Sequence, residues 1–349
     1  MKGLPCLSLF CEVPCRRKTL WWCGEGYTMR RGRFAVAVLL GLVFNVPGYA
    51  QGAGRSYTLT PYDVPTSMGN NTSLFDLQKG GQFAIGTYFS NKQNAFGVKR
   101  KKGTVTPFNL TDSFINFVIA VSPVAIVGSA DLPNGKRVGT IWPHKRSAGV
   151  WKKALGISLP FPPSAQGPII IDIENYKSTA LLGLNARGDV VGAVQKQDFT
   201  FSGLAIIDGT ISIFDYPGAQ STQAEGIRTD GTMVGTYTFN NTSHGFFRYP
   251  NGQFESFDVP QACETFIYDT NDKGDLAGAY REQPPSVDLD CASQQMRGYV
   301  LTRKDQLLVI TFPRAGTTAT EVQGLDEKGN IAGRFDDATG RHGFLGLLE

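Results

Sequence analysis

Residues that could act as nucleophiles, general bases or metal ligands are scarce in this chain. It contains three histidines, and two of them, His244 and His342, each precede Gly-Phe. Similar segments elsewhere carry Asn, Ser, Ala or Arg at that place, so no ring of metal-binding histidines is predicted. After residue 50 there is no Gly-x-Ser-x-Gly, His-Glu-x-x-His, phosphate-loop or dinucleotide-binding motif. We therefore assign no catalytic, cofactor-binding or metal-binding residue and expect no cofactor.

Two further patterns of acidic residues have structural interpretations. The segment Asp269–Asp275 starts like a calcium-binding loop, but its fifth position is Lys273, which repels a cation, so a turn is favoured. Three repeats have an aspartate at the same position, Asp63, Asp215 and Asp258, which indicates that these residues stabilise turns. A pair of catalytic carboxylates for glycoside cleavage stays an open alternative. The two carboxylates of such a pair can come from separate strands, and their spacing in the sequence then follows no pattern.

The clearest candidate for ligand binding is an aromatic and basic patch. It consists of Trp142, His144, Lys145, Arg146 and Trp151. Tryptophan faces next to Lys and Arg suit stacking on sugars or contact with anionic polymers. The alternative is that both tryptophans are packing residues, Trp151 filling a core position and Trp142 capping the edge of a sheet.

The first 50 residues have the features of a targeting segment. Basic residues at 30–33 precede eleven apolar residues, Phe34–Phe44, and small residues follow up to Ala50. Eleven helical residues span about 16 Å, against about 30 Å of hydrocarbon core, so a secretory signal peptide at 29–50 is predicted rather than a membrane span. Residues 1–28 are interpreted as an upstream extension that precedes the true start at Met29.

The charge and the cysteines support export. The chain has 34 basic and 30 acidic residues, of which seven basic and two acidic lie in residues 1–50, so the remainder carries a net charge of about −1. This balance argues against nucleic acid as a partner. Cys263 and Cys291 remain after the leader, and an oxidising compartment predicts a disulfide between them. Free thiols are the alternative.

A repeat runs through residues 51–349 and fixes the expected architecture. A glycine landmark recurs at intervals of 53, 53, 43, 43 and 55 residues, at Gly86, Gly139, Gly192, Gly235, Gly278 and Gly333. In the clearest unit, the segment Ala224–Val259 contains four β-type runs of four to eight residues separated by turn residues such as Asp230-Gly231. Four short antiparallel strands per unit are typical of a propeller blade, so an all-β, six-bladed β-propeller is predicted.

The two ends of the repeat region predict how the ring closes. The last unit stops after its third strand, His342–Leu348, whereas Tyr57–Pro65 reads as a lone fourth strand. The N-terminal strand would complete the last blade and leave no unpaired edge. An open β-solenoid, the alternative, would not need this exchange.

The repeated units also resemble a known family. The Asn/Asp-rich turn before the glycine pair, the His/Asn-Gly/Ala-Phe tripeptide and the strand end at Phe214–Pro217 are similar to the extracellular HAF-repeat proteins of bacteria. The resemblance covers residues 57–349 and is weakest at 109–168. It implies secretion and a propeller-like array, and it implies no activity and no catalytic residue.

These observations favour a secreted, non-enzymatic propeller, a single domain at 51–349 that is expected to be monomeric. Its expected partner is a glycan or an anionic cell-surface polymer, with no membrane span. The alternative is a propeller hydrolase or lyase acting on an extracellular polysaccharide. Carboxylates or histidines from different blades that converge in a central pocket would favour the enzyme.

Overall fold

The structure is a computed structural model that describes residues 55–144, 168–286 and 290–349. All of these residues belong to one compact unit that begins at Ala50. Within the described ranges the regular elements are β-strands and a short 3-10 helix, η2 (Cys291–Ser293). The predicted all-β fold is therefore confirmed. The predicted signal peptide and the segment 1–28 lie outside the described residues.

Antiparallel groups of four strands are the building units, and we refer to each as a blade. Two blades are separate sheets. The first contains β2 (Asn70–Gln78), β3 (Phe83–Phe89), β4 (Gln93–Lys99) and β5 (Thr104–Pro107). The second contains β14 (Ser221–Ile227), β15 (Met233–Phe239), β16 (Thr242–Arg248) and β17 (Phe254–Phe257).

A third sheet joins two further blades through one parallel pair of residues, Ser178 beside Arg137. Its first blade contains β6 (Asn116–Val121), β7 (Ala125–Asp131), β8 (Arg137–Pro143) and β9 (Ile169–Ile171). Its second blade contains β10 (Ser178–Leu184), β11 (Val190–Gln195), β12 (Phe201–Ile207) and β13 (Thr210–Phe214).

The fourth sheet joins two blades in the same way, at Met296 beside Ala319. One contains β18 (Ala262–Thr270), β19 (Leu276–Glu282), β20 (Met296–Leu301) and β21 (Leu307–Ile310). The other contains β22 (Ala319–Leu325), β23 (Ile331–Asp337), β24 (Gly340–Leu348) and β1 (Tyr57–Tyr62). As predicted, the N-terminal strand is the fourth strand of the C-terminal blade: β1 pairs antiparallel with β24 from Tyr57 opposite Leu348 to Tyr62 opposite Gly343.

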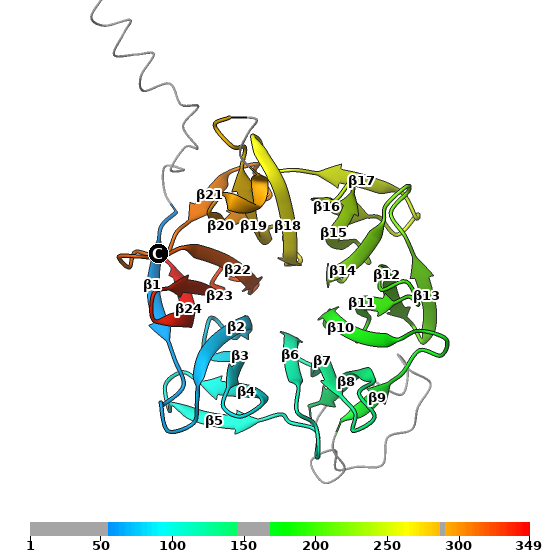
Figure 1. Ribbon diagram of the computed structural model, residues 1–349, viewed down its shortest axis with the longest axis horizontal. Helices are drawn as coiled ribbons and strands as arrows, with labels where there is room; N and C mark the ends of the chain where they lie inside the picture. Colours follow the sequence, from blue (N-terminus) through cyan, green and yellow to red (C-terminus); the bar gives the residue numbers. More distant parts are fainter. Residues whose placement is uncertain (1–54, 145–167, 287–289) are drawn as a thin grey trace, which may run out of the picture. The chain divides into compact units, whose positions relative to one another are not determined.

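The first strand of each blade lies nearest the centre of the arrangement (Figure 1). These inner strands contact one another in the order β2, β6, β10, β14, β18 and β22, and β22 contacts β2 again. The hydrophobic clusters lie between blades. One cluster, for example, joins Leu74 and Phe96 of the β2–β5 blade to Ala332 and Leu345 of the C-terminal blade. A blade therefore buries its faces against its neighbours, which is why one repeat alone would not be stable.

The glycine landmark permits close contact between the first two strands of a blade. A Cβ on Gly86, Gly192, Gly235 or Gly278 would lie 2.0 Å from a backbone oxygen of the inner strand. In the β6–β9 blade the residue in this position is Gly128, so the predicted landmark Gly139 is wrong. Gly139 lies on β8 opposite Ser129, in the place that the tripeptide glycine takes in other blades. The long connection between β8 and β9 lengthens the interval between successive landmark glycines. The prediction of Gly139 depended on that interval being regular.

Candidate functional site

Each inner strand carries a β-bulge at the same level. At this level the pairing register of every inner strand shifts by one residue, and these extra residues are Phe75, Ile119, Leu182, Glu225, Tyr268 and Gln323. A bulge re-aims a side chain. Five of the six side chains, all except Phe75, line a cavity of about 20 Å³ that is also lined by Asp76 and Asp269. This volume accommodates about one water molecule, so the bulge residues close the axis to anything larger.

The residue after the bulge controls how closely the next blade approaches. In three blades it is glycine, and a Cβ on Gly183 would lie 2.4 Å from the Glu225 backbone oxygen of the neighbouring blade. In two blades it is aspartate, and the carboxylate bridges to the next blade. Asp76 Oδ2 accepts a hydrogen bond from Val121 N at 2.7 Å, and Asp269 Oδ2 accepts one from Leu325 N at 2.9 Å.

On one side of this constriction lies a larger hollow, which we name the axial mouth. Its volume is about 400 Å³, and residues from every blade line it. The floor, next to the constriction, includes Asp76 and Asp269. Apolar residues such as Leu184 and Ile227 and polar residues such as Asn185 line the walls, and the rim carries charged turn residues. The rim residues are Lys79, His144, Asp272, Glu327 and Lys328. The Asp-Gly-type turns that the sequence predicted between first and second strands supply most of this rim.

Hydrogen bonds between successive turns hold the rim in place. Asp272 Oδ1 accepts from Thr229 N at 2.7 Å, and Glu327 Oε1 accepts from Asp272 N at 3.0 Å. Asn185 Nδ2 donates to the Arg228 carbonyl at 3.0 Å. These contacts join neighbouring blades, so the opening is a preformed feature of the assembled blades.

The floor of the axial mouth holds two carboxyls with raised pKa values. Burial raises the pKa of Asp269 to about 7, although it accepts hydrogen bonds from the Leu325 and Thr270 amides. Burial, followed by the charge of the nearby Asp269, raises the pKa of Asp76 well above its usual value of 3.8. Near neutral pH these two carboxyls do not both carry a full charge.

Glu225 is the ionisable residue at the constriction that has no charged or hydrogen-bonding partner within the described part of the chain. Burial raises its pKa to about 8. Tyr268, which lines the same small cavity, also has a raised pKa because it is buried and because Glu321 is near. Asp76 and Glu225 were not among the candidate residues predicted from the sequence. Aligning the six inner strands on their bulges would have revealed Asp76 and Asp269 as replacements of the repeated glycine.

The predicted tryptophan-rich patch is only partly described. Trp142 lies on β8, packs edge-on against Phe108 with ring centroids 5.5 Å apart, and has its indole Nε1 buried. His144 lines the axial mouth, with Nδ1 3.0 Å from the Pro123 carbonyl oxygen. Lys145, Arg146 and Trp151 lie outside the described residues. The core position proposed for Trp151, equivalent to Phe246, is held by Thr140 instead.

The other two histidines pair with the repeated aspartates. His244 Nδ1 lies 2.9 Å from Asp258 Oδ2, and its ring stacks on Tyr237. His342 Nδ1 lies 2.9 Å from Asp63 Oδ2. The third of these aspartates, Asp215, faces Lys196 at 3.5 Å. The repeated aspartate thus joins the fourth strand of a blade to the rest of the blade.

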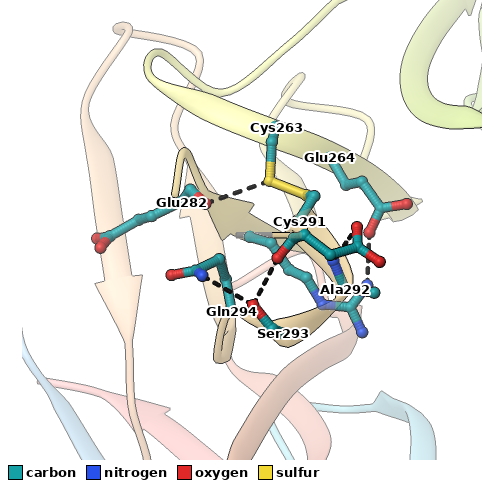
Figure 2. The surroundings of a disulfide bond; sticks show 9 residues. Cys263, Glu264, Glu282, Cys291, Ala292, Ser293 and Gln294 are labelled. Atoms are coloured by element: carbon teal, nitrogen blue, oxygen red, sulfur yellow. Dashed lines mark hydrogen bonds and ion pairs between the residues drawn. A yellow bond between two sulfur atoms is a disulfide. The ribbon is translucent and has the colours of Figure 1, made fainter. Parts of the chain in front are cut away.

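The predicted disulfide is present. Cys263 and Cys291 are bonded, with their Cα atoms 6.0 Å apart, and Figure 2 shows the bond between the start of β18 and the segment that contains η2. Arg281 pairs with Glu264 next to it at 2.5 Å. The bond ties the long β19–β20 connection to the inner strand of the same blade.

The turn that resembled a calcium loop is an ordinary hairpin. Asn271 Oδ1 accepts from the amides of Lys273 and Asp275, and Gly274 N donates to the Asn271 carbonyl. In the described ranges no group of three or more His, Cys, Asp or Glu side chains has a geometry that could hold a metal ion. Those ranges also contain no helix with the length and hydropathy needed to cross a bilayer.

Comparison with solved structures then identifies the fold. The structure of a putative TolB from Agrobacterium tumefaciens superposes with a TM-score of 0.51 over 85% of this chain and 99% of that chain, at 10% identity. This chain has a β-propeller fold. TolB from Acinetobacter baumannii (TM-score 0.47, 8% identity, 90% of this chain and 70% of that chain) and virginiamycin B lyase from Staphylococcus aureus (0.45, 11%, 84% and 100%) are also similar. Because the sequence identities are this low, the similarity to these structures shows the fold and does not show a function. Neither a family model nor a curated protein matches the sequence.

Proposed function

We propose that this chain is an exported, non-enzymatic β-propeller of six blades, closed by β1, that binds a ligand at the axial mouth. The pairing of β1 with β24 and the contact of β22 with β2 support closure. The disulfide and the sequence of residues 29–50 support export to an oxidising compartment. The HAF-repeat resemblance stays a hypothesis.

One observation carries the proposal: every blade contributes to a single hollow of about 400 Å³. This volume is within the range of about 300–1,000 Å³ that is typical of small-molecule sites. A lining that combines apolar residues with convergent polar groups is also typical of such sites. Because the rim is held by hydrogen bonds between blades, little ordering would oppose binding.

The charges of the axial mouth indicate the class of ligand. Five carboxyl side chains and two lysines line it, and the carboxyls are Asp76, Asp269, Asp272, Asp326 and Glu327. This excess of acidic groups disfavours an anionic polymer. A neutral or cationic unit of a glycan, such as a hexose or an amino sugar, suits both the carboxyl oxygens and the volume.

A propeller enzyme that acts on a polysaccharide is the second candidate, and Asp76 and Asp269 favour it. They come from different blades and share one cavity, and burial raises the pKa of each, which is a property of a general acid. However, both oxygens of each carboxylate already accept backbone hydrogen bonds. Glu225 has no such bonds, but it lines the cavity of about 20 Å³ at the constriction, which is too small for a sugar.

Saturation-transfer NMR on residues 51–349 with glucose, galactose, glucosamine and galacturonate tests the proposal. We expect transfer to a neutral hexose or to an amino sugar. Transfer to a neutral hexose should be lost in Lys79→Ala/Lys328→Ala, which removes two exposed rim side chains whose ammonium groups donate hydrogen bonds to hydroxyls. The matched control Lys304→Ala, on an exposed turn elsewhere, should bind like the parent protein. Transfer that is absent for all four sugars, or equal in the rim variant, would contradict the proposal. Release of reducing ends from a polysaccharide, abolished by Asp269→Asn, would favour the enzyme.

A further inference from the structure

A second hollow lies at the opposite ends of the inner strands. It comprises two cavities, of about 690 and 340 Å³, which share Phe89, Gln93 and Phe117 as lining residues. We name this continuous depression the aromatic groove. Whereas Asp76 and Gln78 at the end of β2 line the axial mouth, Asn71 and Ser73 at its beginning line the groove. The two hollows therefore open at different ends of the blades.

Phenylalanine rings form the apolar surface of the groove. Phe114 is 74% exposed and Phe89 is 44% exposed, and both line the smaller cavity. Phe117 lies in the shared part, and the Arg137 guanidinium lies 5.5 Å from its ring centroid. Phe75 contributes at the inner end. Two strongly exposed phenylalanines in one depression present an apolar surface that a ligand would cover.

Five of the six charged residues that line the groove form ion pairs; for the sixth, Lys92, the described part of the chain shows no such partner. Arg334 Nη2 lies 2.9 Å from Glu321 Oε2, and Arg341 pairs with Asp336 through two contacts of 2.8 Å. Arg314 forms an ion pair with Asp337, and Arg137 forms one with Asp131. Side chains paired in this way can still form hydrogen bonds with a ligand, but each pair carries little net charge. The groove therefore favours a ligand that is polar and neutral.

The backbone around the groove disfavours an extended peptide. A peptide that adds to a sheet needs unpaired backbone groups at an edge strand. Here the Phe114 carbonyl accepts from Gln93 N at 2.9 Å, and the Ile115 carbonyl accepts from Asp131 N at 3.0 Å. Recognition in the groove would thus depend on ring faces and polar side chains.

We infer that the aromatic groove binds a neutral carbohydrate chain. The apolar faces of successive sugar rings would lie on Phe89 and Phe114, in the manner in which amphipathic rings stack. Hydroxyl groups would exchange hydrogen bonds with Asn71, Gln93 and the Asp336–Arg341 pair, which line the same depression. The two cavities, of about 690 and 340 Å³, together have room for several sugar units, in contrast to the single unit expected in the 400 Å³ of the axial mouth.

Titration calorimetry with residues 51–349 tests this inference. The probes are the neutral hexasaccharides of cellulose, xylan, starch and N-acetylated chitin, the anionic alginate hexasaccharide and a phenylalanine-rich hexapeptide. We expect binding of a neutral hexasaccharide, and a loss of affinity of about tenfold or more in Phe114→Ala and in Phe89→Ala. Phe199→Ala is the matched control, because Phe199 is 66% exposed but lies outside the groove, with Lys177 on its ring.

The outcomes are separable from those at the axial mouth. If Lys79→Ala/Lys328→Ala leaves hexasaccharide binding intact while Phe114→Ala weakens it, the groove is an independent site. Binding of none of the neutral chains, binding of only alginate or only the peptide, or equal binding by Phe114→Ala and the parent protein would overturn the inference. Unchanged thermal unfolding of the variants, expected for exposed side chains, checks that they fold.

Discussion

His342 Nδ1 lies 2.9 Å from Asp63 Oδ2, although 279 positions separate the two residues. The same imidazole contacts Thr339 Oγ1 and Asp337 through Nε2, at 2.9 and 3.3 Å. In the β14–β17 blade, His244 makes the equivalent contact to Asp258 within one continuous stretch of chain. The N-terminal segment thus reproduces across the chain termini the contact that an interior blade makes locally.

Removal of residues 51–65 should destabilise the protein far more than loss of the His342–Asp63 contact. The deletion exposes the edge of β24 and removes Tyr57 and Leu59, which pack on the last hydrophobic cluster. We expect the free energy of unfolding in urea to fall by several kcal/mol. The matched variant Asp63→Asn, which removes the negative charge that faces His342, should cost at most about 1 kcal/mol, since Asp63 is exposed to solvent. Equal effects of the two changes would show that β1 adds nothing beyond this contact.

Stability should fall between about pH 5 and pH 8.5 because of the axial carboxyls. Burial raises the pKa of Glu225 to about 8 and that of Asp269 to about 7 in the folded protein. The folded state therefore binds more protons than the unfolded state in this window, so the free energy of unfolding decreases as pH rises. The stabilisation is fully present below about pH 4 and is lost as pH rises through these folded-state values.

Glu225→Gln isolates this effect. The glutamine side chain cannot ionise, so the free energy of unfolding of the variant, measured in urea, should decline less between pH 5 and pH 8.5 than that of the parent protein, by an amount on the order of a few kcal/mol. Glu255→Gln is the control, because Glu255 lies away from the axis on β17. A pH slope in Glu225→Gln that equals the parent slope would contradict the burial of this carboxyl.

The Cys263–Cys291 bond should stabilise the fold by about 3–4 kcal/mol, because it closes a loop in the unfolded chain. Reductant should therefore lower the urea midpoint of the parent protein. The double variant Cys263→Ser/Cys291→Ser should unfold at that lower midpoint and should not respond to reductant. A parent protein that is insensitive to full reduction, verified by thiol titration, would argue against this contribution.

The architecture was predictable because turns and strand alternation are local properties. The Asp230-Gly231 pair is a turn in the structure, and Gly231 has a φ of 89°, which glycine adopts without strain. The lone strand near Tyr57 was identifiable because it repeats the strand end at Asp258. In contrast, the landmark Gly139 was misplaced, since an irregular connection shifts spacing without changing the blade around Gly128.

The candidate sites were far less predictable, because they are assembled from residues distant in sequence. Asp76 and Asp269 meet at the axial mouth only because their strands are both innermost. The aromatic groove joins Phe89 to Phe117 across a blade boundary, where no periodicity links them. The predicted tryptophan patch followed sequence proximity, and Trp142 and His144 lie in different environments two residues apart.

Ring closure by the N-terminal strand is the basis of both proposed sites, and a disulfide cross-link tests it most directly. Thr58 lies opposite Leu347 in the β1–β24 register, and opposite residues have Cβ atoms about 4.5–5.5 Å apart, within the reach of a disulfide after small adjustment. Peptide mapping of Thr58→Cys/Leu347→Cys under non-reducing conditions should show a bond between residues 58 and 347 in nearly all molecules. Free thiols at both positions, or a bond no more frequent than in the mismatched Thr58→Cys/Lys304→Cys variant, would contradict a closed ring.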